Sequence, residues 1–333
     1  MKYFITGGTG FIGRRLIEKI LSIGGEITLL DRTTTDLKGI EGNKGVKIIK
    51  GSLFDVPSMK DAMKGADVVF HLAGYAKNWC RDNCIYEKIN VEGSINVAAA
   101  ASEAKVKKMV HVSSIVTFGP TDETEHDESP LPCEIVRFTE YEKTKAQAEE
   151  ELIRFAGTHK ELDIVIVNPS RVYGPGIITE ANSLTLMIKN YLNFHEYLLL
   201  GLGNNVANYV FVDDVVKGLL LAANKGKNGE KYILGGETAS LRGFFRKLRM
   251  VSGKRAIPIV VPKPVAMAIG FCAELAAKLF GIYPFITRPW IRHFCADWNY
   301  GSGKAIKELG YAPTSLDDGL KTTVDWLKQK RQA

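Results

Sequence analysis

The sequence predicts an α/β fold in which a parallel β-sheet carries helices on both faces. Three observations support this. The first half of the chain alternates short Val- and Ile-rich runs with longer helical runs, the apolar runs are almost uninterrupted, and a glycine-rich turn joins the first run to the first helix. Strands that are apolar on both sides are typical of parallel sheets covered by crossover helices. Right-handed crossovers then give a Rossmann-type, doubly wound sheet.

The first half of the chain contains the elements that build this sheet. The sequence predicts strands at 2–6, 26–30, 46–50, 67–72, 107–113 and 162–168, and helices at 11–23, 57–63, 83–104 and 139–156. Further along, the helical periodicity is less regular and prolines cluster, until a last amphipathic helix at 316–329. We therefore expect a smaller, mostly helical C-terminal lobe.

The composition is that of an ordinary globular chain. It has 333 residues, of which 45% are hydrophobic and 24% charged, which excludes wholesale disorder. The net charge of +7 is spread along the chain without a Lys/Arg block, so we expect no nucleic-acid partner. The 5 cysteines are scattered and the 6 histidines form no ligand cluster. We therefore expect no metal, no disulfide framework and a reducing, cytoplasmic location. The amino-terminal residues do not have the pattern of a signal peptide, so none is expected.

A glycine-rich turn follows the first predicted strand and precedes the first predicted helix. It reads Thr-Gly-Gly-Thr-Gly-Phe-Ile-Gly at 6–13. Gly7 permits a sharp turn, Gly10 leaves room for a pyrophosphate against the backbone, and Gly13 lets the helix pack close to the sheet. The free N–H groups and the positive dipole end of the helix attract phosphate. The turn therefore predicts a dinucleotide site.

An acidic residue at the end of the second strand supports that prediction. A carboxylate at Asp31 would accept hydrogen bonds from the adenosine ribose and repel a 2′-phosphate, which favours NAD. The next residue, Arg32, could instead pair with a 2′-phosphate, so NADP stays open as the alternative.

A tyrosine and a lysine four residues apart form the candidate catalytic pair. On a helix, Tyr141 and Lys145 share one face, and the nearby ammonium is expected to lower the pKa of the tyrosine. Such a tyrosine can move a proton to or from a substrate hydroxyl, and Ser114, at the end of the preceding strand, can hydrogen-bond the reacting oxygen. Tyr300 and Lys304 have the same spacing, but the two glycines between them oppose a helix, so we expect no catalytic role for this second pair.

These motifs occur together, and in this order, in one known family. The chain resembles the extended short-chain dehydrogenase/reductases, also called the NAD-dependent epimerase/dehydratase family, over nearly its whole length. The segments that carry the resemblance are 6–13, 71–74, 90–94, 112–114, 141–145, 168–176 and 211–215.

The resemblance implies roles for individual residues. Ser114, Tyr141 and Lys145 match the catalytic residues, and Lys145 would also hold the nicotinamide ribose. Ser52 stands where the family usually has an aspartate, which weakens the expected contact to the adenine amino group. With the turn and the acid described above, the expected cofactor-binding residues are Gly7, Gly10, Phe11, Ile12, Gly13, Asp31, Arg32, Ser52, Leu53, Leu72, Ala73, Gly74, Asn90, Tyr141, Lys145, Pro169 and Ser170.

The family implies an NAD(P)-dependent oxidoreductase that transfers a hydride between nicotinamide and a secondary alcohol or ketone. The segment 206–210 has no arginine, whereas nucleotide-sugar enzymes commonly carry one there for the diphosphate. This segment, with 264–281 and 304–313, resembles the 3β-hydroxysteroid dehydrogenase and dihydroflavonol reductase-like branch, so an apolar substrate is expected. Two alternatives are a nucleotide-sugar epimerase or dehydratase with tightly bound NAD, and a redox-sensing dinucleotide-binding protein without turnover.

Residues 1–175 are expected to form the NAD(P)-binding domain, with segments around 205–235 returning to it, and 176–333 the substrate-binding lobe. The apolar run 265–279 is interrupted by charged residues and is too short to span a bilayer. It is expected to be a buried lobe helix; the alternatives are that it receives an apolar small-molecule substrate or contacts a membrane surface peripherally. A homodimer through the helices at 83–104 and 139–156 is expected by analogy with the family.

Other polar side chains have structural alternatives. His71 and His111 lie in predicted strands and are expected to be hydrogen-bonded core groups rather than ligands. Arg171 could reach the substrate or pair with a carboxylate. The acidic run 149–151 is expected to be a solvated helix face.

Overall fold

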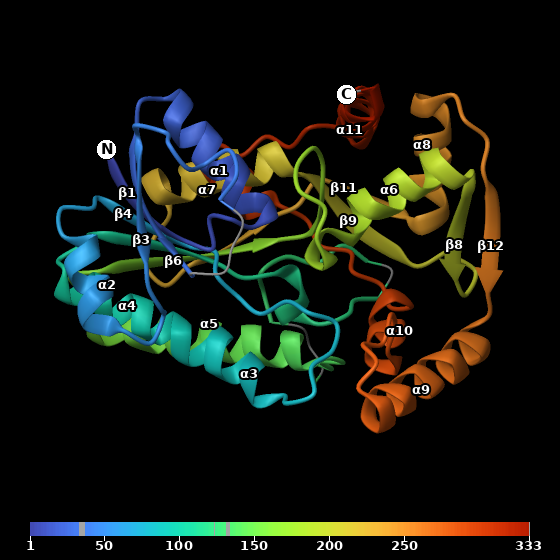
Figure 1. Ribbon diagram of the computed structural model, residues 1–333, viewed down its shortest axis with the longest axis horizontal. Helices are drawn as coiled ribbons and strands as arrows, with labels where there is room; N and C mark the ends of the chain where they lie inside the picture. Colours follow the sequence, from blue (N-terminus) through green and yellow to red (C-terminus); the bar gives the residue numbers. More distant parts are fainter. Residues whose placement is uncertain (33–36, 123, 131–133, 333) are drawn as a thin grey trace.

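The computed structural model describes residues 1–32, 37–122, 124–130 and 134–332 (Figure 1). Its centre is a seven-stranded sheet in the order β10-β6-β5-β4-β1-β2-β3, in which every neighbouring pair is parallel. The strands are β1 (Lys2–Thr6), β2 (Glu26–Asp31), β3 (Val46–Lys50), β4 (Val68–His71), β5 (Lys108–Val112), β6 (Asp163–Pro169) and β10 (Lys231–Leu234). The predicted doubly wound sheet is confirmed, and β10 adds a strand that the sequence analysis did not predict.

Helices cover both faces of this sheet. α1 (Phe11–Ser22) and α7 (Val212–Lys225) lie on one face, whereas α2 (Val56–Met63), α4 (Gly93–Glu103) and α5 (Glu140–Thr158) lie on the other (Figure 1). All residues of β4 are buried, which explains why such strands read as uninterrupted apolar runs. The strand order reverses between β1 and β4, and ligands of such sheets bind beside that point, at the carboxyl ends of the strands.

The helix that carries the predicted catalytic pair begins at a capping box. The Thr139 hydroxyl accepts a hydrogen bond from the Glu142 N–H at 3.2 Å, and the Glu142 carboxylate accepts one from the Thr139 N–H at 3.4 Å. The box satisfies N–H groups that the first helical turn leaves free. It thereby fixes where α5 starts and which way its first side chains point.

The predicted helix at 83–104 contains a π-helical segment. α3 (Cys84–Glu87) continues into π-helical residues Lys88–Glu92 and then into α4. Asn90, an expected cofactor-binding residue, is buried within the π-helical segment. Such segments are frequent at functional sites because they re-aim side chains.

The remaining elements form a smaller lobe with two short sheets, in the orders β11-β9-β7 and β12-β8. Their strands are β7 (Arg171–Tyr173), β8 (Glu196–Leu200), β9 (Val206–Phe211), β11 (Glu237–Ser240) and β12 (Ile257–Val261). The lobe's helices are α6 (Ser183–Phe194), α8 (Leu241–Ser252), α9 (Lys263–Phe280), α10 (Arg288–Phe294) and α11 (Leu316–Gln332). Buried aromatic side chains such as Tyr209, Phe244 and Trp298 fill the centre of this lobe.

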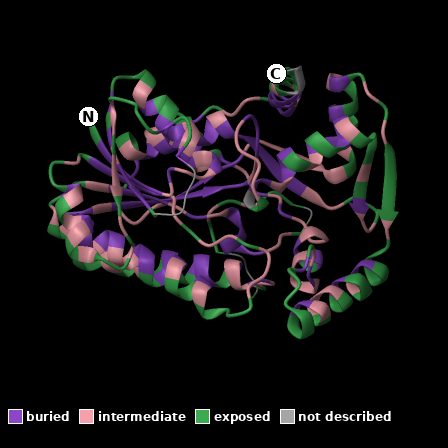
Figure 2. Ribbon diagram, viewed as in Figure 1, coloured by how far each residue is buried: buried purple, intermediate pink, exposed green. Residues whose placement is uncertain are grey.

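The apolar run at 265–279 forms α9, and its large side chains face outward. Leu279 and Phe280 are 66% and 74% exposed, and Figure 2 shows α9 and β12 largely as exposed ribbon. The buried residues of α9 are small (Ala266, Gly270 and Ala277). The expectation of a buried lobe helix is therefore wrong, because only a narrow small-residue side of α9 packs against α10. No described helix is long and apolar enough to cross a membrane.

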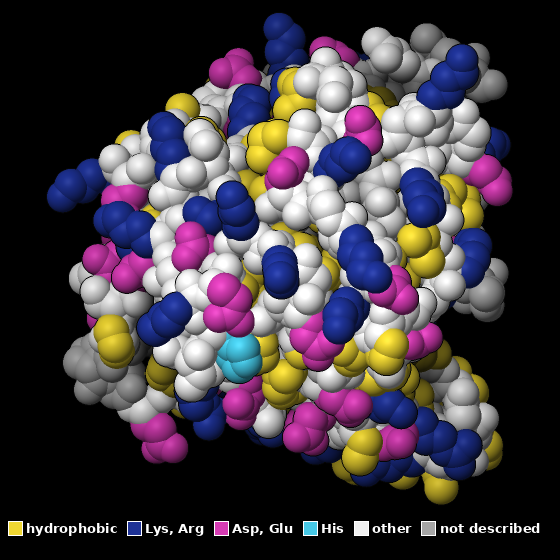
Figure 3. Space-filling model, turned by 90° about the vertical axis from the view of Figure 1, so that its left-hand side faces the viewer, with side chains coloured by type: hydrophobic (Ala, Val, Ile, Leu, Met, Phe, Trp, Pro, Cys, Tyr) yellow, Lys and Arg dark blue, Asp and Glu magenta, His cyan; other side chains and the backbone are white. Residues whose placement is uncertain are grey.

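Charged side chains of both signs are mixed on the face of the molecule seen in Figure 3. Lys and Arg side chains alternate there with Asp and Glu side chains rather than forming a stripe. A nucleic-acid surface typically concentrates one sign of charge, so this face lacks that pattern.

Candidate active site

The glycine turn lies between β1 and α1 at the carboxyl edge of the sheet. Gly7 has φ +71°, and a Cβ there would lie 2.5 Å from the Ala73 nitrogen. A Cβ at Gly13 would overlap the backbone of Gly7 and Gly8. At Gly10, the N-cap residue of α1, a Cβ would meet a single atom within 4 Å, and no side chain caps the helix. This open, uncapped helix start fits a pyrophosphate.

Other expected cofactor residues surround this turn. Leu72 and Ala73 follow β4 and lie against Gly7, and Gly74 comes next. Asn90 accepts a hydrogen bond from the Tyr75 N–H at 2.7 Å, which holds the segment after β4 in place. Phe11 is buried and Ile12 half-buried at the start of α1, and Ser170 lies buried at the end of β6 after Pro169.

Asp31 ends β2 as predicted, but it has a basic neighbour that the sequence analysis missed. Asp31 is 6% exposed, and Lys50 Nζ lies 3.1 Å from its Oδ2. The two residues are register partners in the parallel pair β2–β3, a proximity that only the strand pairing reveals. Arg32 is exposed beside them.

The adenine-side segment after β3 is partly exposed. Ser52 is exposed, and its hydroxyl accepts a hydrogen bond from the Phe54 N–H at 3.2 Å. Leu53 is half-buried and packs near Gly93 at the start of α4.

The three predicted catalytic residues lie together at the carboxyl edge of β5. Ser114 follows β5 and is the N-cap residue of the short 3₁₀ helix Ile115–Phe118. Ser114 interacts with Tyr141 on the first turn of α5, in the direction that lowers the pKa of the phenol. One turn later, the buried Lys145 donates a hydrogen bond from Nζ to the Val112 carbonyl at 2.8 Å.

The pKa of Tyr141 differs from the sequence-based expectation. Burial raises it to about 12, the interaction with Ser114 opposes this shift, and Glu142 and Glu149 add to it. Lys145, which was expected to lower this pKa, is not among the groups that shift it; its ammonium donates to the Val112 carbonyl. Burial also lowers the pKa of Lys145 to about 8, although Glu149 opposes this shift.

Glu149 is a buried member of the site that the sequence analysis misplaced on a solvated helix face. It lies one turn beyond Lys145 on α5 and is fully buried. The Asn168 amide donates to its Oε1 at 2.6 Å, and Lys231 Nζ of β10 lies 2.6 Å from its Oε2. Asn168 also donates to the Ser114 carbonyl at 3.0 Å, so this network supports the strand end that carries Ser114. Its spacing of four residues from Lys145 and eight from Tyr141 was the sequence signal that could have placed Glu149 on the same side of the helix.

The two strand histidines lie close to Lys145. His71 is hydrogen-bonded at both ring nitrogens, at 2.6 Å to Thr6 Oγ1 and 3.0 Å to Ser94 Oγ, as expected of a core residue. His111 Nε2 lies 3.2 Å from Lys145 Nζ, while its Nδ1 has no partner. Burial, followed by the Lys145 charge, lowers the pKa of both histidines, so both rings are neutral at physiological pH.

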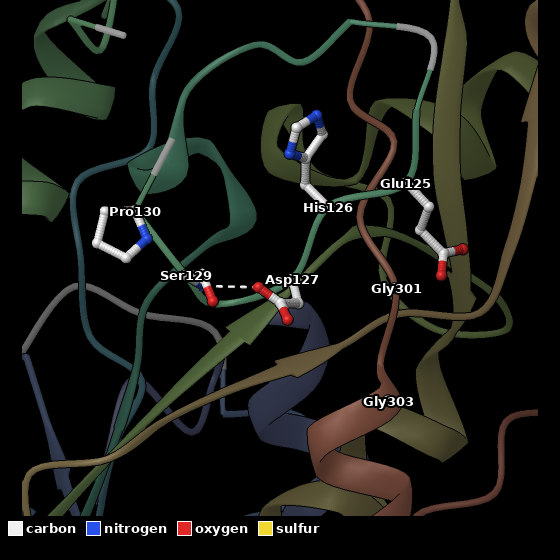
Figure 4. Close-up of a pocket in the computed structure, with 7 residues that line it drawn as sticks. All are labelled: Glu125, His126, Asp127, Ser129, Pro130, Gly301 and Gly303. Carbon is white, nitrogen blue, oxygen red and sulfur yellow. Dashed lines mark hydrogen bonds between the residues drawn. The ribbon is translucent and has the colours of Figure 1, made fainter. Parts of the chain in front are cut away.

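Both side chains of the second Tyr/Lys pair contact other parts of the chain. The Tyr300 hydroxyl donates to the Gly119 carbonyl at 2.8 Å, and Lys304 pairs with Glu230 at 2.6 Å. A cavity of about 370 Å³ lies beside this pair (Figure 4). It is lined by Glu125, His126, Asp127, Ser129, Pro130, Gly301 and Gly303. None of these is an expected catalytic or cofactor-binding residue. Within the described residues, no group of three potential ligands could hold a metal.

A doubly wound parallel sheet with a Ser-Tyr-Lys set and a dinucleotide-binding turn at one edge defines a nicotinamide-dependent oxidoreductase. The profile of the "NAD dependent epimerase/dehydratase family" matches residues 3–235. The chain therefore belongs to this family, and it is an NAD(P)-dependent enzyme of the extended short-chain dehydrogenase/reductases.

Individual relatives cover almost the whole chain. A sterol demethylase protein B from Methylococcus capsulatus is 26% identical, with 99% of each chain covered. A decarboxylating sterol-4-alpha-carboxylate 3-dehydrogenase from Candida albicans is 28% identical, with 98% of this chain and 97% of the relative covered. Among solved structures, a UDP-glucose 4-epimerase from Thermotoga maritima is 25% identical with a TM-score of 0.80, covering 99% of this chain and 100% of the epimerase.

Proposed function

We propose that the protein transfers a hydride between a nicotinamide cofactor and a secondary alcohol or ketone, with Ser114, Tyr141 and Lys145 as its catalytic residues. The observation that carries this proposal is the position of Ser114 after β5 and of Tyr141 and Lys145 on one face of α5, at the edge of the sheet that also presents the glycine turn. NAD, held by the glycine turn and Asp31, supplies the hydride-accepting carbon when it is bound.

Tyr141 is the residue that moves the proton. Its raised pKa keeps the phenol protonated at neutral pH, so it is ready to donate to a ketone oxygen as a carbonyl is reduced. In the oxidation direction, positive charge beside the ring has to lower that pKa before Tyr141 can accept the alcohol proton. The Ser114 hydroxyl can hydrogen-bond the same substrate oxygen and hold it within reach of the phenol.

An apolar small molecule is the substrate class that the relatives favour. The named activities of two of them concern sterols. The test is a panel assayed with NAD and NADP: a neutral 3β-hydroxysteroid, a 3β-hydroxysteroid-4α-carboxylic acid, a dihydroflavonol and UDP-glucose. We expect net NADH formation, or ketone-dependent NADH consumption, with a steroid or flavonoid member. Cofactor binding without turnover of any member would contradict the proposal and favour the redox-sensing alternative.

The epimerase or dehydratase alternative gives a different result in the same assay. Such an enzyme returns the hydride to its substrate, so UDP-glucose would be converted without net NADH production. Its cofactor would also remain bound through dialysis. We expect neither outcome, because the segment before Phe211 lacks the arginine expected of nucleotide-sugar enzymes.

The outward face of α9 and β12 is proposed to contact an anionic lipid surface. Large apolar side chains, including Ile257, Leu279, Phe280 and Phe285, are 66–75% exposed there. The surrounding segment 254–292 carries six basic residues (Lys254, Arg255, Lys263, Lys278, Arg288 and Arg292) and one acidic residue, Glu274. Apolar area next to basic charge is the combination that binds anionic bilayer surfaces.

Vesicle co-sedimentation tests this contact. We expect binding to vesicles that contain phosphatidylserine, weaker binding to pure phosphatidylcholine, and loss of binding at high salt. Leu279→Asp with Phe280→Asp should abolish it, whereas Ile23→Asp, at an exposed apolar residue after α1, should not. If the wild-type protein forms dimers and does not bind vesicles, the face contacts a second copy of the chain instead.

Three further expectations remain predictions. They are the division at about residue 175, the homodimer through the helices at 83–104 and 139–156, and the cytoplasmic location. Light scattering of the purified protein tests the dimer, and limited proteolysis tests the division.

A further inference from the structure

Arg171, the first residue of β7, is a half-buried cation without an acidic partner among the described residues. One guanidinium nitrogen, Nη2, is inaccessible to solvent. No described carboxylate forms an ion pair with Arg171; burial of its guanidinium lowers its pKa, and the interaction with Tyr209 opposes this shift. A partly desolvated charge without a counter-charge destabilises a fold. Pairing with a carboxylate of this chain, one of the two roles left open by the sequence, is therefore not observed.

This cation lies next to the candidate active site. The Phe294 ring of α10 lies 5.4 Å from the guanidinium carbon of Arg171. The preceding residue, His293, is hydrogen-bonded through Nδ1 to Glu142 Oε1 at 2.8 Å. Glu142 follows Tyr141 directly on α5. One end of α10 thus joins the arginine to the helix turn that carries the catalytic tyrosine.

A second buried polar group lies beside Arg171. Tyr209 is its register partner in the parallel pair β7–β9, which places both side chains on the same face of the sheet. The Tyr209 hydroxyl and Arg171 Nη2 are both inaccessible to solvent, and the two side chains interact directly, since each shifts the pKa of the other. A guanidinium fork beside a hydroxyl, bordered by an aromatic ring, fits a planar anion with two oxygens.

We propose that Arg171, assisted by Tyr209, binds a carboxylate carried by the substrate and thereby selects acidic alcohols or ketones over neutral ones. This proposal rests on the hydride-transfer function proposed above. The carboxylate is bound and not changed; the bonds that break are the carbinol C–H, whose hydride leaves to the nicotinamide, and the O–H, whose proton goes to Tyr141. A single buried guanidinium matches the single charge of a carboxylate better than the charge of a diphosphate.

The test compares matched substrates in matched variants. The pair is the 3β-hydroxysteroid-4α-carboxylic acid and the same steroid without the carboxylate. We expect the wild type to prefer the acid, and Arg171→Met to lower kcat/KM for the acid roughly 10- to 100-fold, mainly through KM, while the neutral steroid changes less than about 3-fold. Arg171→Lys should keep part of the preference. Arg246→Met, at an exposed arginine of α8, is the matched control and should change neither value.

A structural role for Arg171 predicts different results. Removing a partly desolvated charge that has no acidic partner should leave the melting temperature of the ligand-free protein unchanged or raise it, whereas loss of a structural contact would lower it. Equal losses for both steroids, or no preference in the wild type, would overturn the proposal while leaving hydride transfer intact. A preference for UDP-glucose that Arg171→Met removes would assign the arginine to a diphosphate instead.

Binding without turnover provides a second readout. In Tyr141→Phe, titration with the steroid acid should show binding that the double variant with Arg171→Met has lost. Equal affinity of the single and double variants would contradict the proposed role.

Discussion

The strand β6 and the helix α9 are both apolar in sequence, yet they have opposite environments. Residues Ile164 to Val167 of β6 are all 0% exposed, whereas Phe280 of α9 is 74% exposed. β6 has hydrogen-bonded neighbours on both sides and helices on both faces, whereas α9 packs through its small residues against α10. Apolar composition therefore predicts burial only where the topology supplies neighbours. Where it does not, the apolar surface remains available to another molecule.

Turnover should depend on the sheet that contains β6, with the helix α5 packed on it, and not on α9. Tyr141→Phe, on α5, removes the hydroxyl that is proposed to move the proton, so turnover should fall by about 10²- to 10⁴-fold. The NAD dissociation constant, measured by fluorescence titration, should change less than about threefold. Tyr300→Phe is the control from the second Tyr/Lys pair and should keep its activity. Full activity of Tyr141→Phe would remove Tyr141 from the mechanism.

Truncation of one buried and one exposed leucine tests the comparison. Leu152, on the helix α5 that packs against β6, is 0% exposed, and Leu152→Ala should lower the free energy of unfolding by about 2–5 kcal/mol. Leu279→Ala, at a side chain that is 66% exposed, should change it by less than about 0.5 kcal/mol. Chemical denaturation measures both. A large loss at Leu279 would mean that α9 supports the fold after all.

Gly7 and Gly24 have similar positive φ angles, so comparing their alanine variants separates the cost of backbone strain from the cost of a steric clash. Gly7 has φ +71° and no room for a Cβ, whereas Gly24 has φ +75° and nothing within 4 Å. Gly24→Ala should therefore cost about 1–2 kcal/mol from backbone strain alone. Gly7→Ala should cost more and should also weaken NAD binding. Equal effects of the two variants would show that the tight approach of Gly7 to Ala73 is unimportant.

The buried lysine predicts a pH dependence of stability. Lys145 titrates at about 8 instead of 10.5, so between these values the unfolded chain binds more protons and stability rises with pH. The difference in unfolding free energy between wild type and Lys145→Met should grow in favour of wild type by about 2 kcal/mol between pH 7.5 and 9.5. A difference that stays constant over this range would show that the ammonium is not desolvated.

Much of the fold was predictable because local patterns determine it. Six of the seven strands of the central sheet and the turn at 6–13 follow from apolar runs and glycine spacing, and these strands were found within one or two residues at each end, whereas β10 was not predicted. The pairing of Lys50 with Asp31 was not predictable, because it depends on the register of two strands. The pKa of Tyr141 was missed for a related reason: burial and the direction of the Lys145 ammonium are properties of the packed structure.

Tyr141, Lys145 and Glu149 lie at positions i, i+4 and i+8 of α5, so their alignment on one side of the helix depends on the number of residues between them. Each added residue turns a helix by about 100°. A one-residue insertion between Tyr141 and Lys145 would therefore rotate the Lys145 ammonium by a quarter-turn or more, away from the end of β5 that it now contacts. Single side chains along α5 can be substituted, but residues cannot be inserted or deleted between these three positions. The spacing of the three positions is therefore constrained as a whole.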